Sequence, residues 1–145
     1  MIGLLQRVSE AEVAVGGKVI GRIGCGLLVL VAVHRDDTER DISRLSERLL
    51  GYRVFPDAEG RMNRSLLEEQ GGLLLVPQLT LAADTRKGTR ASFTKAAPPE
   101  KGAAYFNQLV GICSRQLADV QTGEFGAGMQ VKLVNDGPVT FWLES

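Results

Sequence analysis

The residue types best suited to chemistry occur in residues 76–81, Val-Pro-Gln-Leu-Thr-Leu, where a carboxamide and a hydroxyl alternate with apolar side chains. Alternate residues of an extended backbone point to the same face, so we expect Gln78 and Thr80 to lie side by side. Together they can bind a carbonyl group or a ribose hydroxyl, and backbone N–H groups beside Leu79 can stabilise an oxyanion. The same pattern is also typical of an edge strand with one solvated face.

Thr80 is not expected to attack a substrate itself, because a threonine hydroxyl is a weak nucleophile without an adjacent base. The one histidine, His34, ends an apolar run, where a polar residue often closes a strand. A triad of His34 with Asp36 or Asp37 is conceivable, but no G-x-S-x-G elbow accompanies it. The sequence therefore favours substrate positioning and oxyanion stabilisation over covalent catalysis.

Metal and cofactor chemistry find no support in the sequence. Cys25 and Cys113 are far apart, lie in apolar patterns and lack the spacing of metal ligands, so we expect two buried thiols in a reducing compartment and no metal site. No glycine-rich phosphate-binding motif follows a predicted strand, so no nucleotide cofactor is expected.

A second motif lies in the last eleven residues, 135–145. Residues 135–137, Asn-Asp-Gly, favour a turn, and residues 139–143 are β-branched or aromatic, as strands prefer. Pro138 donates no backbone hydrogen bond, so it belongs at a strand's first residue or at a bulge. One interpretation is an ordinary turn before a strand. The other is a cis Gly137–Pro138 bond, which orients the Gly137 carbonyl in a direction that a trans bond does not allow.

The two motifs, in segments 71–84 and 121–141, together closely resemble the D-aminoacyl-tRNA deacylases. Further matching segments at residues 5–8 (Leu-Gln-Arg-Val) and 51–55 (Gly-Tyr-Arg-Val-Phe) extend the resemblance over essentially the whole chain. The resemblance implies a homodimer that hydrolyses the ester between a D-amino acid, or glycine, and the 3′-terminal ribose of tRNA. It also implies a three-layer β/β/α fold with a barrel-like sheet.

The resemblance also implies how chirality is read. In the family the Gly-Pro bond is cis and enters the active site of the partner subunit, a role that falls here on Gly137 and Pro138. Arg7 would brace this Gly-Pro turn. A rigid Gly137 carbonyl aimed at the substrate's α-carbon would exclude an L side chain by steric clash and admit glycine.

A set of pocket residues follows from the same resemblance. Gln78, Leu79 and Thr80 take the catalytic positions of the family's Ser-Gln-x-Thr motif. Phe125 would pack on the terminal adenine, and Met129 would line the pocket.

One position departs from the family pattern, because Pro77 stands where the family usually has serine. Proline supplies neither a hydroxyl nor an N–H, so a donor at this position is lost. A related group that acts on mischarged L-alanine also has Pro-Gln-x-Thr, with a trans Gly-Pro bond. The alternatives are therefore relaxed specificity for L-alanyl-tRNA, or a non-enzymatic module that binds a nucleotide or an RNA end. The basic loop with Arg86, Lys87, Arg90 and Lys95 suits such a module.

The bulk properties indicate one domain spanning residues 1–145. Lys plus Arg and Asp plus Glu both number 17, so the net charge is zero, and we expect contact with an RNA end rather than with DNA. The longest apolar run, residues 27–33, is too short to cross a bilayer. No signal peptide is recognisable, so the sequence predicts a cytoplasmic protein without membrane contact.

The pattern of elements predicts an α+β fold with two main helices packed on one sheet system. Strands are expected at residues 2–8, 12–15, 18–22, 27–33, 52–55, 73–76, 129–134 and 139–143, with a hairpin at Gly16-Gly17. Helices are expected from the capping box at residues 38–41 to Gly51, and from Pro98-Pro99 to Leu117.

Overall fold

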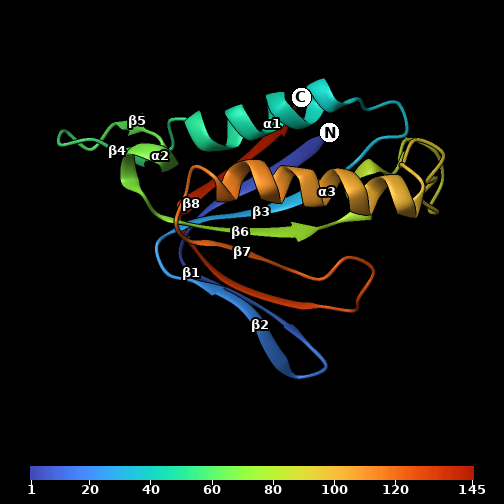
Figure 1. Ribbon diagram of the computed structural model, residues 1–145, viewed down its shortest axis with the longest axis horizontal. Helices are drawn as coiled ribbons and strands as arrows, with labels where there is room; N and C mark the ends of the chain where they lie inside the picture. Colours follow the sequence, from blue (N-terminus) through green and yellow to red (C-terminus); the bar gives the residue numbers. More distant parts are fainter.

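A computed structural model describes residues 1–145 and contains eight strands, three α-helices and one 3-10 helix (Figure 1). The elements in chain order are β1 (Ile2–Val15), β2 (Lys18–Ile23), β3 (Gly26–Ala32), α1 (Glu39–Gly51), β4 (Phe55–Pro56), β5 (Met62–Arg64), α2 (Leu66–Glu69), β6 (Gly72–Pro77), η1 (Leu79–Ala82), α3 (Pro99–Ser114), β7 (Val120–Thr122) and β8 (Gln130–Glu144).

β1 is the strand on which the sheet is built. Its first half pairs with β3, its second half pairs with β2, and its other edge pairs with β8 along nearly its whole length. The β1–β2 hairpin turns at Gly16 and Gly17, whose φ angles are +57° and +80°, as glycine readily allows. The predicted hairpin is therefore confirmed, and the two strands expected at residues 2–8 and 12–15 are one strand.

The main sheet has the order β2-β1-β3-β6-β7, with β8 on the other edge of β1. β3, β6 and β7 are parallel to one another, and the apolar runs of β3 and β6 are buried. β2 curls back toward β7, where a Cβ atom added to Gly21 would lie 3.0 Å from the Thr122 carbonyl oxygen. The glycine therefore permits the close approach that makes the sheet nearly closed and barrel-like.

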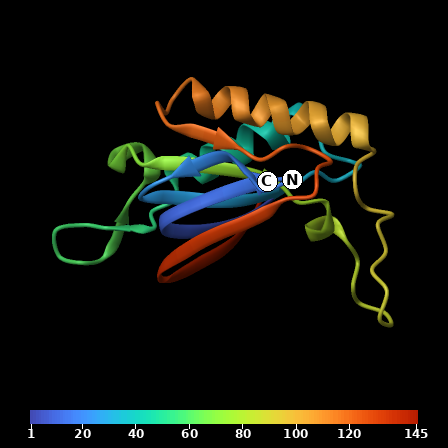
Figure 2. The same cartoon turned by 90° about the horizontal axis from the view of Figure 1, so that it is seen from below.

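Two helices cover one face of this sheet, and the curled half of the sheet covers the other (Figures 1 and 2). A core of 21 buried residues lies between α1, α3 and the sheet, and a second core of seven residues lies inside the barrel-like half. The predicted α+β class, its three layers and its two main helices are confirmed. The capping box of α1 is also confirmed, because the Thr38 N–H donates to Asp41 Oδ2 at 2.7 Å.

Some expectations about local structure are wrong. Residues 135–137 do not form a turn before a strand, because they lie within β8, whose pairing with β1 is irregular there. The strand expected at residues 52–55 is reduced to the two-residue β4, which pairs with β5. Cys25 is exposed, since the buried run begins only at Gly26, whereas Cys113 is buried as expected.

The two thiols should differ sharply in reactivity. Burial raises the pKa of Cys113 to about 12, so this thiol stays protonated at pH 8. Alkylation of the folded protein at pH 8 is expected to add one group, at Cys25, and the second only after denaturation. Mass spectrometry of the intact and digested protein measures both. Rapid labelling of Cys113 in the folded state would contradict the packing of α3.

Candidate active site

The segment that carries Gln78 and Thr80 lies where β6 ends. The Gln78 N–H donates to the Val31 carbonyl at 2.7 Å, and the chain then turns into η1. The Gln78 side chain donates from Nε2 to Thr80 Oγ1 at 2.6 Å, so the carboxamide and the hydroxyl do lie together. A 3-10 turn brings them together instead of the expected extended backbone. The first N–H groups of η1, at Leu79 and Thr80, have no partner inside the helix.

A cavity of about 840 Å³ opens beside this turn. Its lining includes Pro77, Gln78 and Leu79, together with Phe125 and Met129 from the segment between β7 and β8. Leu79 is 53% exposed and Phe125 is 39% exposed, so both present apolar surface at an open site. Thr80 does not line the cavity and is linked to it through Gln78. The structure therefore brings four of the expected pocket residues to one cavity, with Thr80 beside them.

Two glycines make room for the side chains from the β7–β8 segment. A Cβ atom added to Gly102 would lie 3.1 Å from Phe125 Cζ, and one added to Gly123 would lie 2.8 Å from Met129 Sδ. The Glu124 N–H also donates to Met129 Sδ at 3.4 Å. Phe125 therefore lies against α3, and Met129 lies against the end of β7. Sequence reasoning missed both glycines, which carry no local signal of this packing.

The loop between η1 and α3 supplies another wall of the cavity. It extends past the end of the sheet (Figure 2), and its Phe93 and Thr94 line the cavity together with Arg35, which follows β3. Sequence reasoning assigned no role to these three residues, because the loop has no periodic pattern and Arg35 meets it only in the folded chain. The basic side chains of the loop are partly neutralised, since Arg86 and Lys95 both pair with Asp84. These contacts lower the pKa of the Asp84 carboxyl, Arg86 most strongly.

The other predicted group, Arg7 with Gly137 and Pro138, lies on β1 and β8. The Gly137–Pro138 bond is cis, as expected. Val8 pairs with Asn135 and Gln6 with Thr140, so residues 136–139 bulge opposite Arg7. Arg7 Nε donates to the Asp136 carbonyl at 2.9 Å and Nη1 donates to the Val54 carbonyl at 2.6 Å. The guanidinium thus links the bulge to the chain that follows α1.

The two groups do not meet within one chain. Pro77 is in register with Val31 and, through it, with Gly3, whereas Arg7 is in register with Leu27. Along the strand direction, the register of Pro77 and the register of Arg7 are therefore four residues apart, which is about 13 Å. None of Arg7, Gly137 and Pro138 lines the cavity.

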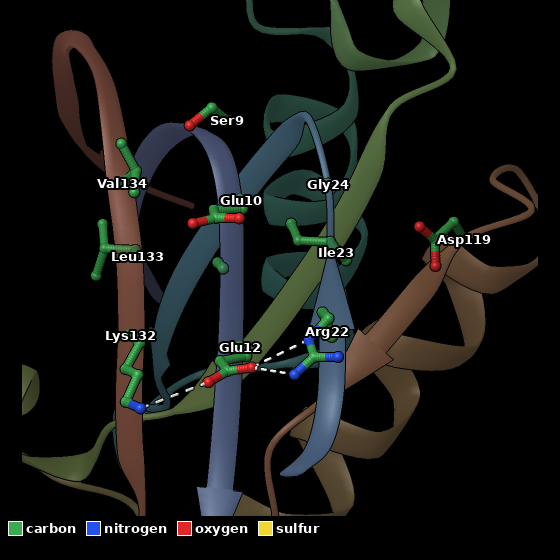
Figure 3. A pocket seen from close by; sticks show the side chains of 11 residues that line it. Ser9, Glu10, Glu12, Arg22, Ile23, Gly24, Asp119, Lys132, Leu133 and Val134 are labelled. Carbon is green, nitrogen blue, oxygen red and sulfur yellow. Dashed lines mark hydrogen bonds and ion pairs between the residues drawn. The ribbon is translucent and has the colours of Figure 1, made fainter.

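A second hollow, of about 700 Å³, lies beside β1, β2 and β8 (Figure 3). Its central carboxylate is Glu12, which accepts from Arg22 Nε and Nη2 at 3.0 and 2.6 Å and lies 3.7 Å from Lys132 Nζ. The hydrogen bonds from Arg22 are the main cause of the lowered pKa of Glu12. The hollow contains none of the predicted site residues, and its central carboxylate is already paired with two basic side chains.

The structure forms neither the histidine–aspartate pair of a triad nor a metal site. The Asp37 carboxylate accepts from the His34 backbone N–H at 2.6 Å and from the Met1 ammonium group at 2.7 Å, so it does not orient the imidazole. No group of three or more His, Cys, Asp or Glu side chains is arranged to hold a metal ion. None of the helices combines the length and apolar character needed to cross a membrane.

Comparisons with known proteins match this chain along its length. The family model described as D-Tyr-tRNA(Tyr) deacylase matches residues 4–144. Proteins named D-aminoacyl-tRNA deacylase from Alkalilimnicola ehrlichii and Pseudomonas aeruginosa are 63% and 59% identical over 145 residues, which is 100% of this chain and 97% and 100% of theirs.

Two solved structures match the fold over almost the whole chain. The structure titled c-Myc DNA Unwinding Element Binding Protein is 36% identical with a TM-score of 0.95, covering 100% of this chain and 99% of its own. A probable eukaryotic D-amino acid tRNA deacylase is 20% identical with a TM-score of 0.85, covering 99% and 98%, and this likeness concerns the fold alone.

Proposed function

Since the chain belongs to the D-Tyr-tRNA(Tyr) deacylase family and hydrolyses the ester of D-aminoacyl-tRNA, we propose that the cavity at the end of β6 is its active site. The observation that carries the proposal is the bonded pair Gln78–Thr80 beside a largely apolar cavity. Binding sites for small ligands usually combine apolar walls with a few convergent polar groups. The apolar wall, with Phe125, receives the terminal adenine, and the polar rim receives the ribose and the ester.

The reaction is the addition of water to the ester carbonyl. The water oxygen bonds to the carbonyl carbon, the carbon–oxygen bond to the ribose breaks, and the proton passes to the ribose oxygen. The N–H groups at the start of η1, near Leu79, are placed to stabilise the oxyanion, a contribution of about 2.7–4 kcal/mol per donor. Gln78 and Thr80 orient the ester and the ribose, and the substrate's own 2′-hydroxyl helps to activate the water.

We propose that the active unit is a homodimer. Gly137 and Pro138 are remote from their own cavity, so they can act on a substrate only in the cavity of another subunit. In a dimer with a two-fold axis, each subunit would place its Gly137 in the cavity of the other, and the two sites would be equivalent. The partner's Gly137 carbonyl would then exclude an L side chain from the site, and Arg7, which bonds to Asp136, would hold the bulge in place.

Substrate scope follows from the same arrangement. A filter that acts by steric clash admits glycyl-tRNA, because glycine has no side chain to exclude. Pro77 lines the cavity at the position where the family usually has serine, so relaxed activity on L-alanyl-tRNA is the second candidate specificity. Aminoacyl-tRNA as substrate also assigns the protein to the cytoplasm. A module that only binds RNA ends is not favoured, because the relatives are deacylases.

The direct test is hydrolysis of matched D-, L- and glycyl-tRNA. Deacylation of D-aminoacyl-tRNA and glycyl-tRNA, with L-aminoacyl-tRNA left intact, is the expected result. Fast hydrolysis of L-alanyl-tRNA would support the relaxed specificity instead. Retention of every ester at saturating protein would sink the assignment of a deacylase.

Thr80→Ala is expected to lower kcat by only about 2- to 12-fold, the effect of losing one ordinary hydrogen bond. The Thr80 hydroxyl accepts from Gln78, and no base lies beside it, so it positions the carboxamide rather than attacking the ester. Single-turnover kinetics with D-aminoacyl-tRNA measures the change. A trapped acyl-Thr80 adduct, or a loss near the million-fold typical of a missing nucleophile, would refute this role.

A further inference from the structure

We propose that Arg35, assisted by Lys101, binds the phosphodiester that joins the last two nucleotides of the tRNA. The inference rests on the proposed function, in which the terminal nucleoside occupies the cavity beside Gln78. It adds an anion site at the mouth of that cavity.

Arg35 is the one charged residue among those that line the cavity. It follows β3 and is tied to the neighbouring loop at two points. Its backbone N–H donates to the Lys95 carbonyl at 2.9 Å, and its Nη1 donates to the Thr94 carbonyl at 2.9 Å. The guanidinium is therefore held at the cavity mouth between β3 and the loop, with its direction fixed by Thr94.

The Arg35 guanidinium keeps most of its capacity to donate. Arginine has five N–H donors, and Arg35 uses one of them within the chain. No carboxylate lies within ion-pair distance of Arg35, whereas Arg22, Arg64 and Arg86 are each paired with an acidic side chain. The free donors are thus available to an anion that arrives with the substrate.

Lys101 adds a second positive charge next to Arg35, although it does not itself line the cavity. Its Nζ donates to the Arg35 carbonyl at 2.7 Å and lies 5.1 Å from the centroid of the Tyr105 ring. No carboxylate lies within ion-pair distance of it. Arg35 therefore brings a cation without a counter-ion to a cavity whose lining is otherwise uncharged, and Lys101, also without one, lies next to Arg35.

The chemistry of an RNA end explains this pair of charges. A terminal nucleoside carries the aminoacyl ester on its 3′ side and a phosphodiester on its 5′ side. When the base and ribose enter the cavity, that phosphodiester stays at the mouth. A planar guanidinium matches two phosphate oxygens, and the ammonium contributes a point charge.

Three substrates isolate the phosphodiester: D-aminoacyl-adenosine, which has no phosphate, the D-aminoacyl ester of cytidylyl-adenosine, which has one, and D-aminoacyl-tRNA. For Arg35→Gln, the ratio of kcat/KM for the dinucleotide ester to that for the adenosine ester should fall about 12- to 160-fold, as for one charged hydrogen bond. The slope of log KM against log salt concentration for the dinucleotide ester should fall by about 0.7, which is the contribution of one phosphate contact on a single strand.

Matched variants separate charge from folding. Arg35→Lys keeps the charge and should recover part of the ratio, and Lys101→Gln should give a smaller fall than Arg35→Gln. Arg115→Gln removes an exposed arginine at the far end of α3 and should leave the ratio unchanged. The unfolding temperatures of all four variants show whether a loss of activity comes from a destabilised loop or fold. Competitive inhibition by adenosine and by 5′-AMP repeats the comparison without turnover.

An unchanged ratio in Arg35→Gln would overturn the proposal. An equal loss on the adenosine ester would assign Arg35 to the nucleoside or the loop, and a loss confined to D-aspartyl esters would assign it to the amino-acid side chain. Either of these two outcomes would also refute the proposed phosphate site. The proposed function fails by a different result, namely adenosine that does not compete with the substrate at all.

Discussion

Gly137→Ala is expected to lower kcat/KM for D-aminoacyl-tRNA by about 100-fold, the effect of a misplacement of about 1 Å at a reacting centre. Gly137 has a φ of +145°, and an added Cβ would lie 2.6 Å from Val139 Cγ2 and 2.9 Å from the Val139 nitrogen. Alanine cannot adopt this backbone without moving residues 136–139. Because the proposed action is on a substrate in the partner's cavity, a local shift should displace the proposed chirality filter. Steady-state hydrolysis of D- and L-aminoacyl-tRNA measures both rate and selectivity.

Gly16→Ala is the matched control. Gly16 also has a positive φ, +57°, but its added Cβ would meet nothing within 4 Å, and it lies in the β1–β2 hairpin. It should lose about 1–2 kcal/mol of unfolding free energy and keep its activity. Equal losses of activity in Gly16→Ala and Gly137→Ala would show that backbone strain alone, and not the place of Gly137, is responsible.

Mixing two variants tests whether Gly137 acts across the proposed dimer. Gln78→Ala removes the carboxamide from the cavity, and Gly137→Ala alters the proposed filter, so each variant alone should be impaired at every site. If each site combines one chain's cavity with the other chain's Gly137, mixed dimers contain one intact site. After denaturation and refolding of an equal mixture, about a quarter of the wild-type activity should return. No recovery above the two separate variants would refute the exchange.

Phe125→Ala is expected to raise KM for D-aminoacyl-tRNA about 5- to 150-fold while kcat changes little. An aromatic platform contributes about 1–3 kcal/mol per stacked base, and this energy is present in both the bound substrate and the transition state. The ring rests on Gly102 of α3 and lines the cavity, so it can present one face to a base.

Phe125→Tyr preserves the aromatic plane and is the matched control, with KM expected within about two-fold of the original because the π-face is retained. Separate measurements of kcat and KM on D-aminoacyl-adenosine exclude contributions from the rest of the tRNA. A fall in kcat at constant KM would place Phe125 in the chemical step rather than under the base.

Local patterns in the sequence were enough to predict much of the frame. The capping box at residues 38–41 and the closing Gly51 predicted α1, and the glycine pair predicted the β1–β2 hairpin. These signals act over a few residues and need no tertiary context. The proximity of Gln78 and Thr80 was also predicted, although a 3-10 turn and not a strand produces it.

Other parts of the site depend on contacts that no local pattern encodes. Arg35 reaches the cavity because Thr94 and Lys95, some sixty residues later, bond to it. Gly102 matters through Phe125, which comes from another element. The expectation that Cys25 is buried was wrong, because its apolar neighbours belong to strands that begin and end on either side of it. The roles of Gly137 and Arg7 came from family resemblance rather than from residue chemistry.

The pairing of β1 with β8 also has a consequence for how the chain folds. Ile2 pairs with Glu144 and Ala14 with Gln130, so the longest ladder in the sheet joins segments more than a hundred residues apart. Closing so large a loop is entropically costly, and domains dominated by such contacts fold slowly. Before β8 pairs with β1 during folding, one edge of β1 is unpaired and can form hydrogen bonds with another chain. A chain cut before β8 should therefore aggregate, and folding should be cooperative because no earlier fragment completes the sheet.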